Sequence, residues 1–493
     1  MGATAGLVPG GPTNTDAGNA QRLVERHGAS LRFCPAMKNW LFWDGRRWAV
    51  DTIGRAQELA KETSRSIYAV AAATEDDHDR RALSSHAKAS ESGPRITAML
   101  RLATSYPKIV VRPEELDSPR TRYMLNVMNG TLDLEIGKLR PHCREDLITK
   151  LAPVAFDPSA KCPRWDAFLS RVQPDHEVSG FLRRYFGSAL TGDTGDEQFV
   201  VAYGAGRNGK STLIETLLAM LGEYGHKADS ELFLAPNGHA SQRGGPRPDL
   251  MALRGTRLVA VVEAAEGRRL DENLVKQLTG RDTITARRLF QDESSFTPEH
   301  KLFLASNYLP RIHGTDPAIW ARVLLVRFEV AIPPEERDTT LKDRLVTPPE
   351  LSGILNWALQ GLREWHAVTT GSRLKPPDSV RAATRDYRED EDVLGPFLAD
   401  RCVLGPEEWT STKDLTVAYR SFCEATGMEE LKDQPFRRRL RSADCKPEPN
   451  PDPRDRSRTR GWRGLRLRGA SEGDPAAGTV GTVEDGSSDE LPF

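Results

Sequence analysis

The sequence lacks the cysteine pairs that mark a zinc ribbon or a disulfide-stapled secreted domain. Its six cysteines are scattered through 493 residues, and none belongs to a CxxC pair. They are Cys34, Cys143, Cys162, Cys402, Cys423 and Cys445. We therefore predict neither a metal cluster nor a disulfide framework, and we expect the reducing environment of a cytoplasm.

Long apolar runs and a strong net charge are missing as well. No stretch approaches the ~20 apolar residues that a membrane helix needs, and the first residues do not join a basic segment to an apolar one as a signal peptide does. The formal net charge is -1, so composition gives no global case for binding nucleic acid or a membrane. We expect a soluble protein with no membrane partner and with any DNA-binding surface confined to local patches.

Shifts in composition divide the chain into parts, and no internal repeat is visible. Short apolar runs predict strands of an α/β sheet, namely QFVVAYG, RLVAVVE, HKLFLASN and RVLLVRFEV. Upstream, helical patterns accompany the aromatic stretch NWLFWDGRRWAV, whose Asp44-Gly45 pair predicts a hairpin turn. The predicted parts are a disordered tail at 1–15, a mostly helical domain at 16–160, an α/β domain at 161–335, a helical connector at 336–389, a DNA-binding module at 390–469 and a disordered acidic tail at 470–493.

The first predicted strand leads into a phosphate-binding loop. The residues GAGRNGKS match the pattern GxxxxGK[ST], and the helical run TLIETLLAMLG follows them, which is the strand-loop-helix context that this motif requires. Backbone N–H groups of such a loop wrap the phosphates, Lys210 reaches the terminal phosphates and Ser211 can ligate Mg²⁺. We predict an ATP site made by Gly204, Ala205, Gly206, Arg207, Asn208, Gly209, Lys210, Ser211 and Thr212.

Polar residues border the later predicted strands, where an ATPase needs them. Glu263 and Glu266 follow RLVAVV, so one carboxylate can lie near Mg²⁺ and one can orient the attacking water. Glu263 is the better placed by position, but the sequence does not decide which of the two activates water. Asn307 ends HKLFLASN and can sense the γ-phosphate. Arg322 precedes the last strand and is a candidate arginine finger acting across a subunit boundary, with a surface salt bridge as the equal alternative.

The module at 390–469 is basic within a near-neutral chain. Residues 437–468 hold 12 Lys or Arg against 4 Asp or Glu. The runs STKDLTVAYRSFCEAT and DQPFRRRLRSA predict two helices, and RTRGWRGLRLRG predicts a β-wing, which is the layout of a winged helix. We predict DNA contacts from Arg437, Arg438, Arg439 and Arg441, with a merely solvated basic face as the alternative.

These motifs, in this order and spacing, resemble the superfamily 3 DNA helicases of the phage and plasmid replicative primase-helicase family. The likeness rests on GAGRNGKST, RLVAVVEAAEGRRLDENLVKQLTGRDTITARRLFQ, FTPEHKLFLASNYLPRI and DPAIWARVLLVRFE. It implies a P-loop, AAA+-like core behind a collar-like N-terminal part. By resemblance, the residues of the ATPase site are Lys210, Ser211, Glu263, Glu266, Asn307 and Arg322. The family often has two adjacent arginines after the Trp, whereas this chain has Ala321 before Arg322.

The resemblance also implies the partners. The stretch 276–288 is similar to the family's DNA-tracking hairpin, and a solvated basic loop is the alternative. Its predicted DNA contacts are Lys276, Arg281, Arg287 and Arg288. The family implies ATP and Mg²⁺ as cofactors, a homo-hexameric ring on single-stranded and forked DNA, and origin duplex bound by the winged helix. Fuller relatives carry a primase-polymerase domain upstream, and the collar-like region at 16–160 leaves no room for one here. We therefore expect a helicase without its own primase activity and a separately encoded primase.

The sequence thus predicts an ATP-dependent replicative helicase of a phage, plasmid or integrated mobile element. An ATP-switched, origin-binding initiator without processive unwinding is the first alternative. A DNA-packaging or transport ATPase is the second, and it is disfavoured because no nuclease domain is apparent and the motif order is that of the replicative helicases. Strand displacement distinguishes the helicase from the initiator.

Overall fold

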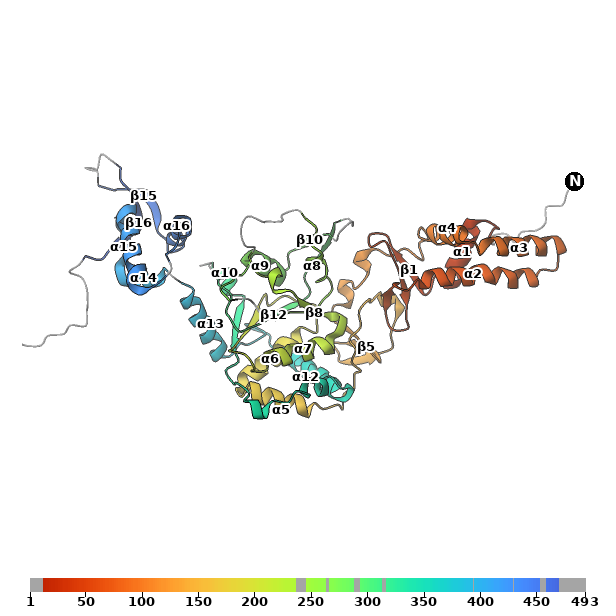
Figure 1. The fold of residues 1–493 in the computed structure, drawn as a ribbon, viewed down its shortest axis with the longest axis horizontal. Helices are drawn as coiled ribbons and strands as arrows, with labels where there is room; N and C mark the ends of the chain where they lie inside the picture. The colour runs from red at the N-terminus through yellow and green to blue at the C-terminus, as the bar shows by residue number, and fades with distance from the viewer. Residues whose placement is uncertain are drawn as a thin grey trace, which may run out of the picture. The chain divides into compact units, whose positions relative to one another are not determined.

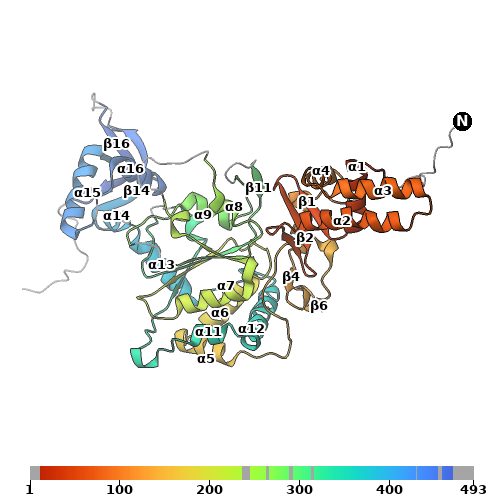
Figure 2. The same ribbon diagram turned by 45° about the vertical axis from the view of Figure 1, so that its right-hand side comes forward.

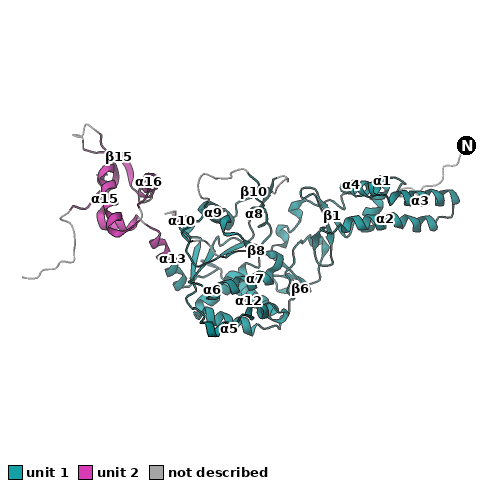
Figure 3. Ribbon diagram, viewed as in Figure 1, with its two compact units in different colours: residues 1–312, 318–385 teal, residues 313–317, 386–493 magenta. Residues whose placement is uncertain are grey.

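The chain forms two compact units in a computed structural model. Residues 1–312 and 318–385 make unit 1, and residues 313–317 and 386–493 make unit 2 (Figure 3). The residues that the structure describes are 12–235, 245–262, 266–287, 293–312, 316–392, 394–428, 430–452 and 458–469. No helix within these ranges is long and apolar enough to cross a membrane.

Unit 1 begins with helices that lie side by side (Figure 1), namely α1 (Asp16–His27), α2 (Arg55–Ala72), α3 (Asp77–Ser90) and α4 (Gly93–Ala103). The Thr15 side chain caps α1 by accepting the N–H of Gly18, and the Asp76 side chain caps α3 by accepting the N–H of Asp79. Apolar side chains such as Leu23, Leu59 and Met99 form the core that α1, α2 and α4 share. The helical character predicted for this region is confirmed.

The aromatic stretch forms the predicted hairpin. Strands β1 (Leu31–Cys34), β2 (Asn39–Trp43) and β3 (Trp48–Val50) make one antiparallel sheet. The turn between β2 and β3 holds Gly45 at φ 97°, in the left-handed region that favours glycine. The Asp44 carboxylate accepts the N–H groups of Arg46 and Arg47, which fixes the turn.

A second antiparallel sheet shares its core with the α/β part of unit 1. It consists of β4 (Met124–Val127), β5 (Gly130–Asp133) and β6 (Lys138–Arg140). Leu125 and Leu132 belong to the same apolar cluster as the central parallel strands. The buried Arg257 guanidinium donates to the carbonyls of Met124 and Leu190, so it joins the two parts. The core therefore continues across residue 160, where composition places a boundary.

A five-stranded parallel sheet lies at the centre of unit 1. Its order is β13 (Val323–Arg327), β7 (Phe199–Tyr203), β12 (Lys301–Ser306), β9 (Leu258–Val262) and β8 (Gly225–Ala228). The four apolar runs are strands as predicted, which confirms the α/β fold class with a P-loop-like core. The edge strand β8 was not predicted, because GHKA pairs on one side only and offers no apolar run.

Helices cover both faces of this sheet (Figures 1 and 2). One face carries α5 (Pro163–Val172), α6 (His176–Ser188), α7 (Lys210–Leu221), α11 (Leu341–Leu345) and α12 (Pro348–His366). The other carries α8 (Pro248–Met251), α9 (Glu272–Thr279) and the hairpin of β10 (Ile284–Ala286) and β11 (Ser294–Phe296). Side chains alternate along the strands, so Phe303 joins the first layer while Leu302 and Leu304 meet Val275 of α9.

Shorter elements complete unit 1. They are α10 (Pro317–Trp320), α13 (Asp378–Asp390) and the 3-10 turns Pro113–Glu115, Pro119–Thr121, Arg144–Asp146, Gly222–Tyr224, Ser230–Leu232 and Pro334–Glu336. The Thr384 hydroxyl on α13 accepts the N–H of Leu325 at 3.0 Å, so α13 protects the exposed edge of β13. The helix α13 ends in unit 2.

Unit 2 contains the predicted helix pair and a final hairpin. Its elements are α14 (Gly395–Arg401), β14 (Cys402–Ser411), α15 (Thr412–Thr426), α16 (Asp433–Ser442), β15 (Lys446–Pro449) and β16 (Arg460–Leu467), and its antiparallel sheet has the order β14-β16-β15. Ser411 caps α15, and Gly427 ends it at φ 70°, in the left-handed region that favours glycine. The stacked rings of Tyr419 and Phe436 join α15 to α16 within the core.

Candidate functional site

The P-loop connects the carboxyl end of β7 to the first turn of α7. Gly206, Arg207 and Gly209 have φ values of 95°, 52° and 85°, and these left-handed conformations let the loop curl back on itself. Gly204 leaves no room for a side chain, because a Cβ atom there would lie 2.1 Å from Asn208 Nδ2 and 2.3 Å from the carbonyl oxygen of Phe328. The loop is therefore packed tightly against the end of β13.

Lys210 lies within this loop and is 5% exposed. Its ammonium donates to the Gly204 carbonyl at 2.8 Å, to Asn208 Oδ1 at 2.8 Å and to Asn307 Oδ1 at 3.1 Å. Burial lowers the pKa of Lys210. The fold thus brings Lys210 and Asn307 together at the carboxyl edge of the sheet, where ligands bind in open α/β sheets.

Asn208 has a role that the sequence pattern does not reveal. Its Nδ2 donates to the Phe328 carbonyl at 2.8 Å, while its Oδ1 accepts from Lys210. One amide therefore ties the P-loop lysine to the end of β13. The loop motif predicts a residue here that contacts phosphate, but only the tertiary structure shows the bond to a residue 120 positions away.

Oxygen ligands for Mg²⁺ are expected at the same edge. The hydroxyl-bearing Ser211 and Thr212 are half-buried at the start of α7, directly after Lys210. Glu266 is exposed beyond the carboxyl end of β9, and Glu263 lies outside the described residues. Serine hydroxyl and carboxylate oxygens are the hard donors that Mg²⁺ prefers, so the donor types fit this ion.

Arg322 lies at the opposite edge of the sheet from Lys210. It directly precedes β13, and its carbonyl accepts the N–H of Phe199 at the start of β7. Its guanidinium donates to Glu197 at 2.5 Å and to the Ala318 carbonyl at 2.8 Å. The length of β7 separates this edge from the P-loop by roughly 16 Å, at about 3.3 Å per residue. Within one chain, Arg322 does not join the phosphate site.

The basic stretch predicted to contact DNA, residues 276–288, begins within α9 and includes β10, the first strand of the β10–β11 hairpin. Lys276 is half-buried on α9, and Arg287 is exposed directly after β10, where its carbonyl accepts the N–H of Arg247. The Arg281 side chain is 70% exposed and reaches within 4.0 Å of Asp193. Arg288 lies outside the described residues. The predicted segment thus contains one strand of a two-stranded hairpin, and the second strand, β11, follows it in the chain.

The arginines of α16 fall on two sides of that helix. Arg437, Arg438 and Arg441 are exposed, whereas Arg439 is 3% exposed, and burial lowers its pKa. Arg439 follows the core residue Phe436 by one helical turn, so both point inward. Arg439 is therefore not positioned on the surface with the other three, and this spacing could have been recognised in the sequence.

Comparisons with known proteins agree with the motifs. A family model described as "D5 N terminal like" matches residues 20–174, and a family of unknown function, DUF5906, matches residues 202–322. The protein "Putative helicase L207/L206" of Acanthamoeba polyphaga mimivirus is 28% identical over 302 residues, which cover 57% of this chain and 30% of the viral protein. The chain is a distant homologue of viral proteins that are named putative helicases and putative primases. Its resemblance to superfamily 3 helicases is thereby confirmed.

Further relatives of the chain carry similar names. "Putative helicase 022R" of Frog virus 3 is 28% identical over 281 residues, covering 52% of this chain and 28% of that protein. "Putative primase C962R" of African swine fever virus (strain Badajoz 1971 Vero-adapted) is 23% identical over 325 residues, covering 62% of this chain and 33% of that protein. The chain thus aligns with about a third of each relative's length. The apo structure of the NrS-1 C-terminal region is similar at a TM-score of 0.47 and 11% identity, over 85% of this chain and 84% of that one.

Proposed function

We propose that this chain is an ATP-dependent replicative DNA helicase of a phage, plasmid or integrated mobile element, and that it translocates on single-stranded DNA as a hexameric ring. The observation that carries the proposal is that the expected site residues lie at opposite ends of the parallel strands. Lys210 and Asn307 meet at the carboxyl edge, while Arg322 lies at the amino edge. Because Arg322 cannot reach the ATP site of its own chain, this separation favours a site that a neighbouring subunit completes.

In this proposal the P-loop binds ATP through its backbone N–H groups and Lys210. The ammonium of Lys210 leaves the oxygens of Gly204 and Asn208 for the terminal phosphates, which offer stronger, charged acceptors. Ser211 and Glu263 would hold Mg²⁺, which neutralises charge on the β- and γ-phosphates when bound. Asn307 then contacts the γ-phosphate, and Glu263 or Glu266 orients the attacking water.

Arg322 would serve the ATP bound by the adjacent subunit. An arginine supplied across a boundary stabilises the charge that develops on the transferred phosphoryl group, and it is worth about 10³–10⁵ in rate. Because Arg322 lies roughly 16 Å from its own P-loop, it is suited to this role only in an assembly. This geometry favours a ring over a monomeric ATPase.

DNA would be bound at two basic surfaces. In unit 1, the stretch with Lys276, Arg281, Arg287 and Arg288 would follow the phosphates of a single strand through the ring. In unit 2, α15, α16 and the β15–β16 hairpin follow the order of a winged helix. The exposed arginines of α16 would bind origin duplex there, and a separately encoded primase would act on the unwound strand. The exposed α16 arginines are Arg437, Arg438 and Arg441.

An ATP-switched initiator is the second candidate, because unit 2 is a compact unit with its own basic helix. It would bind origin duplex and use hydrolysis only to reset assembly. Such a protein hydrolyses ATP but does not separate strands.

Fork unwinding by the purified chain tests the proposal. Wild type should displace one strand in the presence of ATP and Mg²⁺, and Lys210→Ala should reduce displacement at least 100-fold, because the phosphates lose their buried cation. Lys88→Ala, which removes an exposed lysine on α3, is the matched control and should unwind normally. Native mass spectrometry in the presence of ATP should give the mass of a hexamer. ATP-regulated origin binding without displacement would support the initiator, and a monomer inactive on forks of both polarities would refute the helicase.

A further inference from the structure

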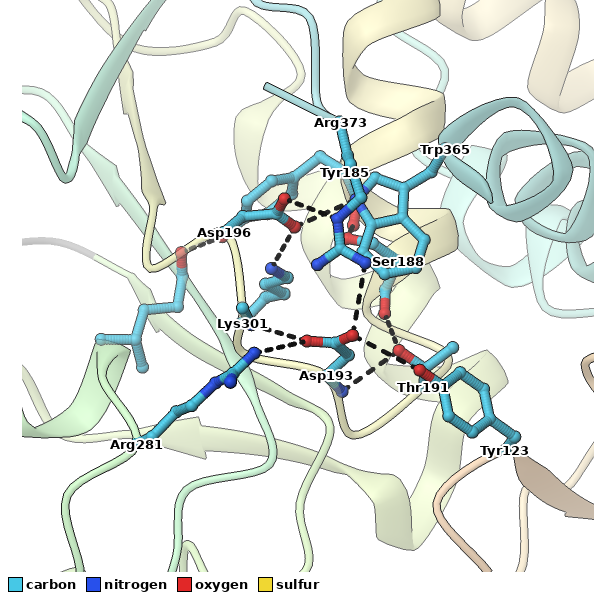
Figure 4. A network of polar contacts seen from close by, with 12 residues as sticks. Tyr123, Tyr185, Ser188, Thr191, Asp193, Asp196, Arg281, Lys301, Trp365 and Arg373 are labelled. Atoms are coloured by element: carbon cyan, nitrogen blue, oxygen red, sulfur yellow. Dashed lines mark hydrogen bonds and ion pairs between the residues drawn. The ribbon is translucent and has the colours of Figure 1, made fainter. Parts of the chain in front are cut away.

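The loop between α6 and β7 holds basic residues from several separate parts of unit 1. The Asp193 carboxylate lies 3.4 Å from Arg373 and 4.0 Å from Arg281 (Figure 4). Asp196 accepts from Lys301 at 2.9 Å and from Arg373 at 3.3 Å (Figure 4). These bonds anchor the loop firmly to the start of β12 and to the segment after α12.

Glu197, the last acidic residue of this loop, binds Arg322. Glu197 has φ 54°, a left-handed conformation that is uncommon for residues other than glycine. Its N–H donates to the Thr194 carbonyl at 2.9 Å, so the anchored loop maintains this conformation. The next residue, Gln198, donates from Nε2 to the Ala321 carbonyl at 3.2 Å. Backbone and side chains of the loop thus hold the turn that carries Arg322.

The hydrogen bonding of Arg322 is incomplete. One terminal nitrogen donates to Glu197 and the other to the Ala318 carbonyl, but the buried Nε–H has no acceptor among the residues that the structure describes. The Arg322 side chain is 18% exposed. A buried donor without an acceptor is unfavourable, and a phosphate oxygen is a strong acceptor for guanidinium. Arg322 is therefore held in place by two hydrogen bonds, while its Nε–H lacks an acceptor among the described residues.

The Glu197–Arg322 ion pair contributes little to the stability of the fold. Glu197 is 44% exposed, and ion pairs with an exposed partner contribute little to folding. A left-handed glutamate adds a local cost, and such conformations concentrate at functional sites. The Glu197 carboxylate and the Ala318 carbonyl together fix where the Arg322 guanidinium lies.

We propose that Glu197 is the positioning residue of a trans-acting Arg322, holding its guanidinium ready for the γ-phosphate of ATP bound by the adjacent subunit. This inference rests on the proposed function, in which Arg322 completes the neighbour's site. Glu197 does not touch the nucleotide and acts only through Arg322. Misplacing a catalytic group by about 1 Å costs on the order of 100-fold in rate, so loss of Glu197 should cost 10- to 100-fold.

Mixed rings test this inference. Arg322→Ala subunits keep an intact P-loop but lack the finger, and Lys210→Ala subunits lack an active P-loop but keep the finger. Each alone should hydrolyse ATP poorly, and mixing them should restore DNA-stimulated hydrolysis at interfaces that pair one subunit of each kind. Glu197→Ala is then added to either subunit.

Glu197→Ala placed in the Lys210→Ala subunit should lower the restored kcat 10- to 100-fold, since that subunit supplies Arg322. The same change in the Arg322→Ala subunit should leave it unaltered. Equal losses in both positions, or no loss in either, would overturn the inference. Failure of the unmodified mixture to regain activity would overturn the trans-acting finger itself, and that result is visible before Glu197 is changed.

Two further variants separate the carboxylate from the backbone. Glu197→Asn tolerates the left-handed conformation but cannot reach Arg322, so it should behave as Glu197→Ala does. Glu197→Gln keeps one acceptor and should retain part of the restored kcat. Glu430→Ala breaks an exposed 2.7 Å ion pair with Arg420 in unit 2 and should change nothing. If Glu197→Asn matches wild type, the positioning role is wrong.

Discussion

Removing the Asp196 carboxylate should destabilise unit 1 strongly. Lys301 and Asp196 form an ion pair whose side chains are 3% and 5% exposed. Asp196 also accepts from Trp365 Nε1 at 3.0 Å and from Arg373 Nε at 3.3 Å. The change Asp196→Ala leaves a buried ammonium and an indole N–H without their acceptor.

The magnitude follows from these contacts. Leaving one member of a buried ion pair alone costs about 3–5 kcal/mol, and the indole donor adds about 1 kcal/mol. Lys301→Met is milder, at about 1–3 kcal/mol, because Asp196 keeps Arg373 and Trp365 as partners. The two variants should therefore differ by about 3 kcal/mol at the centre of these ranges, with Asp196→Ala the less stable.

Urea unfolding followed by tryptophan fluorescence measures this difference. Burial lowers the pKa of Lys301 and Asp196 opposes that shift, so the pKa falls further in Asp196→Ala. Raising the pH toward 10.5 should then recover stability in this variant, because its unfolded state binds the proton more tightly than its folded state. Asp378→Ala, which breaks an exposed pair with Arg381, should leave the midpoint unchanged. Equal losses for Asp196→Ala and Lys301→Met, or a loss under about 1 kcal/mol, would refute the reasoning.

Three further outcomes are expected. Gly204→Ala should weaken nucleotide binding at least 10-fold in a titration with a fluorescent analogue, because its Cβ would displace Asn208; unchanged affinity would contradict the tight packing of the loop. Burial lowers the pKa of His300 to about 3, so the folded state resists the proton that the unfolded state takes up below about pH 6.5. Protonation of His300 in the unfolded state should lower the free energy of unfolding by about 2 kcal/mol between pH 7.5 and 5. The urea midpoint of His300→Leu should fall less over this pH range than that of wild type. Parallel pH profiles for the two proteins would contradict this prediction. Arg438→Ala should reduce the slope of log affinity for duplex DNA against log salt by about 1, whereas Arg439→Ala should lower thermal stability and leave that slope intact.

Much of the α/β part of unit 1 could be predicted because its signals are local. Apolar runs mark β7, β9, β12 and β13, since strands buried on both faces need continuous apolar side chains. The P-loop is equally local, because phosphate wrapping requires glycines and a lysine at fixed spacing. The edge strand β8 was missed for the opposite reason, since it has one neighbour and little apolar content.

The sequence by itself therefore determined the P-loop, the α/β class and the likeness to superfamily 3 helicases, since each depends on residues close together in the chain. Only the tertiary structure decided that Asn307 meets Lys210 and that Arg322 lies at the opposite edge, bound to Glu197. The partners in these contacts are 97 and 125 positions apart. Their meeting depends on the order of strands in the sheet, which hydrophobic pattern does not specify.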